Sequence, residues 1–255
     1  MNCRVCEGDE TALFSSAEIF GRKVDYFECG SCGYVQTEDP SWLDQAYSSP
    51  INKCDTGIMA RNQCNVSVVL GTLSAIGKKY GCVIDCAGGY GILVRLLRDQ
   101  GIEALWSDPY CKNLLAIGFE HTSEKVDLVT AFEAFEHFNN PLSETEKLFL
   151  MAPNLLISTK IIPSPTPAPT KWWYYGLDHG QHIGFFRKKT LEYLAKKFGK
   201  HLVTDGDSYH LFTEVPISSF SWRLKIKLAQ RFPLLFTCGH RSKVLDDFQK
   251  MSISE

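Results

Sequence analysis

The chain has 255 residues with 27 Lys and Arg against 29 Asp and Glu, which gives a formal net charge of −2. The length suffices for one sizeable α/β domain and a small second module, and the near-neutral charge argues against a broad nucleic-acid-binding face. The sequence has neither an apolar run long enough to span a membrane nor an apolar signal core at its N-terminus. We therefore expect a cytoplasmic protein whose ten cysteines stay reduced or bind metal.

Two cysteine pairs of identical spacing lie in the first part of the chain. Cys3-x-x-Cys6 and Cys29-x-x-Cys32 are separated by the 22 residues 7–28. Four thiolates supplied as two close pairs suit tetrahedral Zn²⁺, and the spacing resembles that of a zinc ribbon; the alternative is four unrelated free cysteines. Four cysteines leave no open coordination position, so we expect structural zinc that supplies much of the folding energy of so short a segment.

A glycine-rich turn between a strand and a helix is the central motif. The short apolar segment 83–86, which includes the acid Asp85, predicts a strand, residues 87–91 predict a turn, and the apolar periodicity from Ile92 to Leu97 predicts a helix that stops at Gly101. Glycines in such a turn let the backbone approach a bound nucleotide, where a Cβ would collide with it. Before this unit, residues 56–80 predict another helix, which either packs on the sheet or covers the cofactor.

The spacing of this turn resembles motif I of class I S-adenosylmethionine-dependent methyltransferases, with Ala87 in the first glycine position. A glycine-rich loop of some other α/β protein is the alternative. The resemblance implies S-adenosylmethionine as cofactor and S-adenosylhomocysteine as product. It also implies a set of cofactor-binding residues in and next to the turn: Asp85, Ala87, Gly88, Gly89 and Gly91.

A second predicted strand, residues 103–106, ends shortly before Asp108. A carboxylate at the carboxyl end of this strand is suited to accept hydrogen bonds from both ribose hydroxyls. Only residues 110–125 separate Asp108 from the next apolar strand, so one strand and one helix must be short or reduced. That next strand, residues 126–132, leads into Glu133 and the sequence up to Pro141, which resembles the stretch after the fourth strand of the same methyltransferases. Phe132 is therefore a further cofactor-binding candidate.

These segments together predict an α/β, Rossmann-like methyltransferase fold with a mostly parallel seven-stranded sheet and an antiparallel last strand. We expect three consecutive parts: a zinc-binding ribbon and linker (1–50), the methyltransferase domain (51–215) and a C-terminal helical tail (216–255). The tail is basic and partly amphipathic. It is expected either to pack as a solvated helix or to contact a membrane surface.

One candidate set for handling the acceptor proton is Glu133-x-x-Glu136-His137, whose members would share one face of a helix. Carboxylates and imidazole suit Mg²⁺, Mn²⁺ or a similar divalent ion. The pattern resembles that of metal-dependent O-methyltransferases of ubiquinone synthesis and small-RNA 2′-O-methylation, which implies a further histidine ligand, His179 or His182. The second candidate set uses no metal: His182 or His137 accepts the proton directly, and a loop tyrosine orients the substrate.

The resemblance implies methyl transfer from S-adenosylmethionine by in-line displacement, in which the enzyme chiefly aligns the reacting atoms. We expect O-methylation of a small-molecule or saccharide-type acceptor. One alternative is an RNA methyltransferase that contacts nucleic acid through the ribbon, although the ribbon is not basic. A catalytically inactive scaffold with this fold is the other, because Ala87 and the compressed stretch after Asp108 depart from the family pattern.

Overall fold

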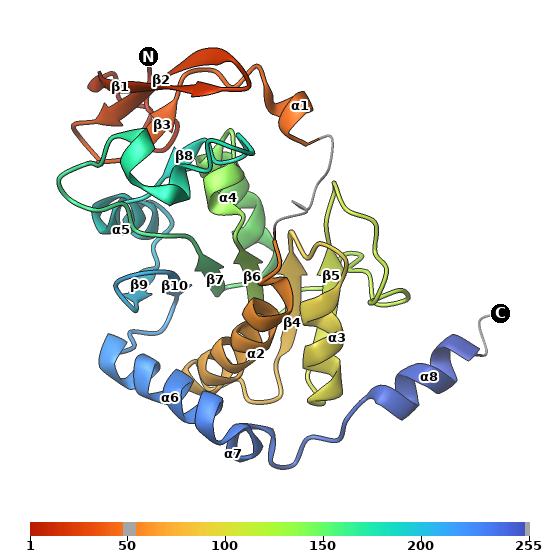
Figure 1. Ribbon diagram of the computed structural model, residues 1–255. Helices are drawn as coiled ribbons and strands as arrows, with labels where there is room; N and C mark the ends of the chain where they lie inside the picture. Colours follow the sequence, from red (N-terminus) through yellow and green to blue (C-terminus); the bar gives the residue numbers. More distant parts are fainter. Residues whose placement is uncertain (48–54, 253–255) are drawn as a thin grey trace. The chain divides into compact units, whose positions relative to one another are not determined.

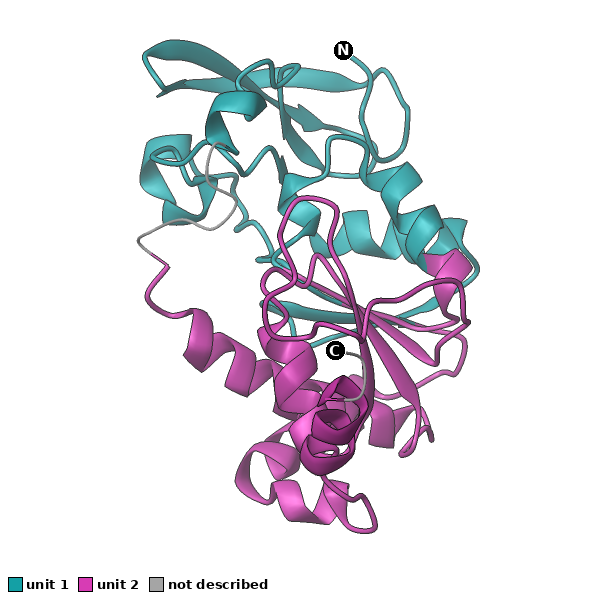
Figure 2. Ribbon diagram, turned by 90° about the vertical axis from the view of Figure 1, so that its right-hand side faces the viewer, with its two compact units in different colours: residues 1–52, 133–148, 157–212 teal, residues 53–132, 149–156, 213–255 magenta. Residues whose placement is uncertain are grey.

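The computed structural model describes residues 1–47 and 55–252. The chain forms two compact units, one of residues 1–52, 133–148 and 157–212 and one of residues 53–132, 149–156 and 213–255 (Figure 2). The first fifty residues thus share a unit with two segments from the second half of the chain. The expected division into 1–50, 51–215 and 216–255 stays a prediction about which parts fold alone, and its first boundary lies outside the described residues.

A six-stranded sheet with the order β5-β4-β6-β7-β10-β9 carries the Rossmann-like fold. Strand β4 pairs in parallel with both β5 and β6. Its residues Val83 and Ile84 are fully buried, as expected of a strand covered on both faces. The strands of this sheet are β4 (Cys82–Cys86), β5 (Glu103–Ser107), β6 (Leu128–Phe132), β7 (Leu155–Ser158), β9 (His201–Thr204) and β10 (Tyr209–Thr213).

The last strand is antiparallel, as predicted. The N–H groups of Thr159 and Ile161 donate to the carbonyls of Ser208 and Asp207 respectively, so the partner number falls as the residue number rises. This is the order of an antiparallel pair. Strands β9 and β10 are neighbours joined by the four residues 205–208, which is too short a connection for parallel strands.

The prediction of seven strands was wrong, because the sheet has six strands among the described residues. Between β5 and β6 the chain forms turns, and a single parallel bridge joins Trp106 to Glu120. A parallel crossover needs about a dozen residues besides the strand itself. Residues 110–125 are too few for both, so the strand is reduced to the bridge.

Helices α2 and α6 of the second unit pack closely on each other. Gly71 of α2 lies so close to α6 that a Cβ at this position would be 2.8 Å from Ile226 Cα. Trp222 of α6 is fully buried and its Nε1 donates to Thr72 Oγ1 at 2.9 Å. Figure 1 shows α6 running along α2. The helices are α2 (Ile58–Ala75), α3 (Ile92–Asp99), α6 (Ser219–Arg231), α7 (Pro233–Thr237) and α8 (Val244–Ser252).

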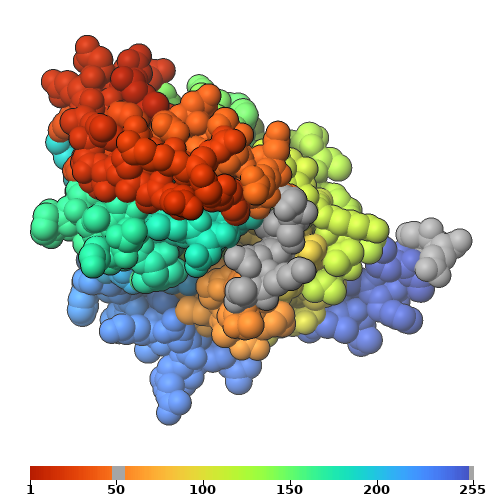
Figure 3. Space-filling view, turned by 45° about the horizontal axis from the view of Figure 1, so that its top comes forward, coloured from red at the N-terminus to blue at the C-terminus, as the bar shows by residue number. Residues whose placement is uncertain are grey.

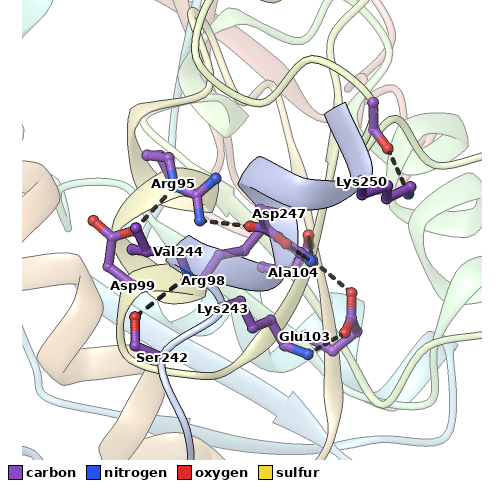
Figure 4. A network of polar contacts seen from close by, with 11 residues as sticks. Arg95, Arg98, Asp99, Glu103, Ala104, Ser242, Lys243, Val244, Asp247 and Lys250 are labelled. Carbon is purple, nitrogen blue, oxygen red and sulfur yellow. Dashed lines mark hydrogen bonds and ion pairs between the residues drawn. The ribbon is translucent and has the colours of Figure 1, made fainter. Parts of the chain in front are cut away.

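A buried ion pair attaches the C-terminal helix α8 to α3 (Figure 4). Both nitrogens Nε and Nη2 of Arg98 donate to the carboxylate of Asp247, at 2.8 and 2.7 Å. The two side chains are only 5% and 7% exposed. Burial raises the pKa of Asp247, but the hydrogen bonds from Arg98 and Arg95 outweigh it, so the pKa lies below its usual value.

We expect Asp247→Asn to lower the free energy of unfolding by about 3 kcal/mol, because it leaves the buried Arg98 charge without its main partner. The neighbouring Asp246→Asn is the matched control, since Asp246 is 59% exposed and lies 3.6 Å from Arg241. A surface pair of this kind contributes about 0–1 kcal/mol. Urea unfolding of both variants makes the comparison, and equal losses would contradict the assigned role. Because the pKa of Asp247 is depressed, its contribution should be present above about pH 4 and disappear as acid protonates the carboxyl.

The first unit contains a second, four-stranded sheet with the order β1-β2-β3-β8. The segment between the cysteine pairs contains a β-hairpin. The turn of this hairpin, at Phe20 and Gly21, has φ values of 51° and 75°. Strand β3 pairs with β8 far along the chain, with Val35 opposite Phe185. Figure 3 shows the N-terminal residues (red) against this later segment (green to teal). The strands are β1 (Thr11–Ile19), β2 (Arg22–Cys29), β3 (Val35–Thr37) and β8 (Gly184–Phe185).

The aromatic residues 172–175, which follow the proline-rich residues 162–169, pack at the core of the first unit. Tyr174 and Tyr175 are buried, and the Tyr175 ring lies 5.2 Å from that of Tyr26. Trp173, by contrast, is 75% exposed. The remaining helical segments are α1 (Leu43–Ala46), η1 (Phe135–His137), α4 (Pro141–Met151), η2 (Pro169–Lys171), η3 (Trp173–Tyr175) and α5 (Lys188–Lys197).

Candidate functional site

The glycine-rich turn of the second unit follows β4, which ends in a buried carboxylate. Asp85 is 4% exposed and accepts a hydrogen bond from Thr130 Oγ1 of the neighbouring strand β6 at 2.7 Å. Burial raises the pKa of Asp85 to about 7. Phe132, the last residue of β6, is half-buried. Parallel strands β4 and β6 therefore both deliver candidate residues at their carboxyl ends.

The backbone of this turn has the left-handed conformation that glycine favours. Ala87, Gly89 and Gly91 have φ values of 59°, 54° and 87°. Ala87 adopts this conformation although it carries a Cβ, so the turn keeps its shape without a glycine in the first position. At Gly88 and Gly91 the turn has no room for a side chain. A Cβ at Gly91 would lie 2.9 Å from Ala116 Cβ, and one at Gly88 would lie 2.9 Å from Trp106 Cδ1.

Asp108 lies beside the turn. Its Oδ2 accepts the Gly89 N–H at 2.9 Å, and its Oδ1 accepts the N–H groups of Tyr110 and Cys111 at 2.8 and 2.9 Å. Trp106 Nε1 donates to Gly89 O at 2.9 Å. These bonds fix the carboxylate and the turn against each other.

A polar cluster in the first unit brings together Glu136, His137 and His182. One ligand atom from each residue lies within 4.8 Å of the others. Glu136 is fully buried, its Oε1 accepts the hydroxyl of Tyr174 at 2.6 Å, and its Oε2 has no hydrogen-bond partner among residues 1–47 and 55–252. Burial raises the pKa of Glu136 to about 7. Such an orphaned buried oxygen is costly unless a proton, a cation or a ligand occupies it.

The two histidines of the cluster are held in defined orientations. His182 Nδ1 lies 2.6 Å from Tyr174 O, and because a carbonyl only accepts, Nδ1 must carry the proton. Its Nε2 is then an acceptor. His137 Nδ1 lies 2.8 Å from the hydroxyl of Tyr47. Burial lowers the pKa of both rings, which keeps them neutral.

Glu133 and His179 lie at the margin of this cluster. The prediction that Glu133, Glu136 and His137 share one face of a helix was wrong. Glu133 has a φ of 49°, and Phe135–His137 form a single 3₁₀ turn. The Glu133 carboxylate accepts the Ser158 hydroxyl at 2.6 Å instead of joining the group of possible ligands. The His179 ring lies 4.8 Å from that of His182, and burial lowers its pKa to about 4.

The four N-terminal cysteines converge on one point. Sγ of Cys3 lies 3.5 Å from that of Cys32, Sγ of Cys6 lies 3.6 Å from that of Cys29, and all four lie within 4.8 Å of one another. Zinc–sulfur bonds of ~2.3 Å in a tetrahedron separate the sulfurs by about 3.8 Å. The four thiols therefore fit a Zn²⁺ ion.

Three residues of these sites were not individually predicted from sequence. Tyr174 and Tyr47 bind the polar cluster, and Thr130 binds Asp85. For Tyr174, the sequence predicted only that some loop tyrosine orients the substrate. No local pattern marks the other two, because their partners are 90 and 45 residues away along the chain.

A family model described as a methyltransferase domain matches residues 60–204, more than half of the chain. The chain belongs to this methyltransferase family. With the glycine-rich turn described above, it is an S-adenosylmethionine-dependent methyltransferase. No curated protein matches the chain.

Several solved methyltransferases are similar to the chain. Magnesium protoporphyrin IX methyltransferase (ChlM) from Synechocystis PCC 6803 with bound SAH is 17% identical, with a TM-score of 0.46 over 67% of this chain and 90% of that chain. Mitomycin 7-O-methyltransferase MmcR is 15% identical, with a TM-score of 0.43 over 68% and 60%. The methyltransferase domain of bacterial CtHen1-CN is 21% identical, with a TM-score of 0.41 over 60% and 98%. Likeness at this level concerns the fold alone.

Proposed function

We propose that the enzyme methylates an oxygen atom of a small-molecule or saccharide-type acceptor, with His182 as the general base. The observation that carries the proposal is the orientation of His182, whose Nδ1–H donates to Tyr174 O and leaves Nε2 free of its proton. Deprotonation of a hydroxyl acceptor is the one proton transfer that O-methylation requires. A neutral imidazole is suited to it.

The proposed cofactor residues act by position and charge. S-adenosylmethionine supplies the methyl group and a sulfonium leaving group when bound. The turn, which is exposed at Ala87 and half-buried at Gly88 and Gly89, would give the close backbone approach that a nucleoside needs. Asp108 would accept hydrogen bonds from the ribose hydroxyls, while Asp85 and Thr130 fix the end of β4 from which the turn starts.

The acceptor residues follow β6, the parallel neighbour of β4. Ligands in folds of this kind bind at the carboxyl ends of the strands. Glu133 comes directly after the last residue of β6, and Glu136 and His137 come three and four residues later. We propose that Glu136 and Glu133 orient the methyl-accepting substrate and the histidines. His137 would accept a further hydrogen bond next to His182.

A divalent cation is the alternative to direct proton transfer. Glu136, His137 and His182 are close enough to bind one ion, and Glu136 Oε2, which has no partner in the described part of the chain, is a suitable ligand atom. An ion such as Mg²⁺ would lower the pKa of an acceptor hydroxyl. We also propose that Cys3, Cys6, Cys29 and Cys32 hold a structural Zn²⁺ ion, on the sulfur distances given above.

Two measurements test the function. Calorimetric titration should show S-adenosylhomocysteine binding at micromolar strength, on the order of −8 kcal/mol. Methyl transfer to a panel of hydroxyl acceptors, followed by release of S-adenosylhomocysteine, should then identify the acceptor class. Activity that is lost with a chelator and restored by Mg²⁺ supports the metal route, and unchanged activity supports direct proton transfer. Transfer to RNA alone, or to no acceptor despite cofactor binding, would contradict the proposal.

We expect His182→Gln to lower kcat by about 10²- to 10⁴-fold, because glutamine cannot take up the proton. Binding of S-adenosylhomocysteine should stay as in the wild type. His201→Gln is the control, since His201 is exposed on β9. A loss of cofactor affinity equal to the loss of kcat would show that His182 is structural rather than a base.

A further inference from the structure

The chain carries a strongly cationic segment near its C-terminus. Residues 215–245 contain six of the 27 basic residues of the protein and none of its 29 acidic residues. The six are Arg223, Lys225, Lys227, Arg231, Arg241 and Lys243. A segment of this charge in a near-neutral chain favours an anionic partner.

The same segment exposes an apolar stripe. Helix α6 buries Trp222, Ile226 and Ala229, and these face α2. The opposite face, together with α7, exposes six large apolar side chains to solvent by 38–79%. Their positions four residues apart along α6 place the first three in one row. The six are Phe220, Leu224, Leu228, Phe232, Leu234 and Leu235.

Charge and stripe lie on the same face of α6. At 100° per residue, Arg223, Lys227 and Arg231 lie along one side of the row of Phe220, Leu224 and Leu228. These three basic side chains make no ion pair among the described residues, and each is exposed. Monomeric proteins rarely expose a contiguous apolar patch of this kind without a function. Aromatic and leucine side chains bordered by Lys and Arg are the composition of helices that lie in the membrane interface.

We propose that α6 and α7 form a surface that binds an anionic lipid bilayer from one side. The apolar row would enter the headgroup region while the basic side chains contact lipid phosphates. Among the described residues no helix is both long and apolar enough to cross a bilayer. A hollow of about 230 Å³ between α2 and this surface, lined by Leu73, Leu228 and Leu235 among others, offers space for an inserted apolar group.

Flotation of the full-length protein with vesicles tests the proposal. Vesicles of phosphatidylcholine and phosphatidylglycerol in equal parts should bind the protein, and vesicles of phosphatidylcholine alone should bind it far more weakly. The variant R223Q/K227Q/R231Q should lose affinity for the anionic vesicles on the order of 100-fold, which is about fivefold per charge. Added salt should weaken binding of the wild type more than that of this variant.

The apolar contribution needs its own variant and control. F220S/L224S should bind the anionic vesicles on the order of 100-fold more weakly, since each side chain loses its transfer into the interface. Leu150→Ser removes an apolar side chain of α4 that is 73% exposed, and should bind as the wild type does. Unchanged S-adenosylhomocysteine binding and unchanged thermal unfolding show that the variants are folded.

Three outcomes would overturn the proposal. They are failure of the folded wild type to float with anionic vesicles, equal binding by F220S/L224S and wild type, and a dimer in sedimentation that F220S/L224S dissolves. The last result would assign the surface to a second copy of the chain. None of them depends on the acceptor or on the base assigned above, so the proposed function is tested separately.

Discussion

Gly89→Val is expected to abolish S-adenosylhomocysteine binding, with a loss of affinity of at least ~100-fold, or about 2.7 kcal/mol. Gly89 has a φ of 54°, and its N–H donates to Asp108. A β-branched residue cannot keep this conformation without strain, and its side chain would occupy the space next to the backbone that a nucleoside approaches. Both the shape of the turn and the position of the proposed ribose acceptor should change.

The control for this variant is Gly77→Val in the same unit. Gly77 has a φ of 73° and nothing within 4 Å of an added Cβ, so it brings similar backbone strain without a ligand site. Both variants should lose about 1–3 kcal/mol of stability, but only Gly89→Val should lose the titration signal. Zinc content should remain that of the wild type in both. Near-normal binding by Gly89→Val would remove the turn from the cofactor site.

Cys29→Ser should release the proposed zinc ion and unfold the strands β1 to β3. Zinc contributes about 10–16 kcal/mol in small four-ligand sites, which is as large as the whole stability of a typical domain, about 5–15 kcal/mol. Cys29 is buried at the end of β2 and its Sγ also accepts the Cys32 N–H at 3.5 Å. A serine hydroxyl replaces neither the ligand nor this contact.

The consequence should extend to the segment that carries His182. Ile183 O accepts the N–H of Thr37 at 3.1 Å, and Arg4 donates to the same carbonyl at 3.5 Å. Residues of the N-terminal sheet therefore hold the neighbour of the proposed base. Hydrogen exchange in Cys29→Ser should speed up in residues 11–37 and also in residues 183–185.

The exposed Cys238 supplies the control for this experiment, since Cys238→Ser removes a thiol outside the cluster. Its zinc content, measured by atomic absorption, and its exchange pattern should match the wild type. If Cys29→Ser retained one equivalent of zinc, or lost it with unchanged exchange at residues 11–37, the metal would have no role in holding these strands.

The local order of strands and turns was predictable from sequence because each depends on nearby residues. The apolar residues around Asp85 predicted a strand and the glycines after it predicted a turn, and the structure has both. The close spacing of each cysteine pair likewise predicted convergence of four thiols. In each case either short-range sterics or a known ligand geometry restricts the chain to one arrangement.

The tertiary structure decided what depends on long-range pairing. The pairing of β3 with β8 joins residues 150 apart, as Val35 and Phe185 show, and no local pattern specifies it. The number of strands fell to six because the segment after Asp108 was too short for a crossover. His182 could be named from sequence, but its proton position follows only from the carbonyl of Tyr174 that packing brings to its Nδ1. Residue types set the chemistry that is available, and burial and hydrogen-bond partners determine which group is oriented and neutral enough to use it.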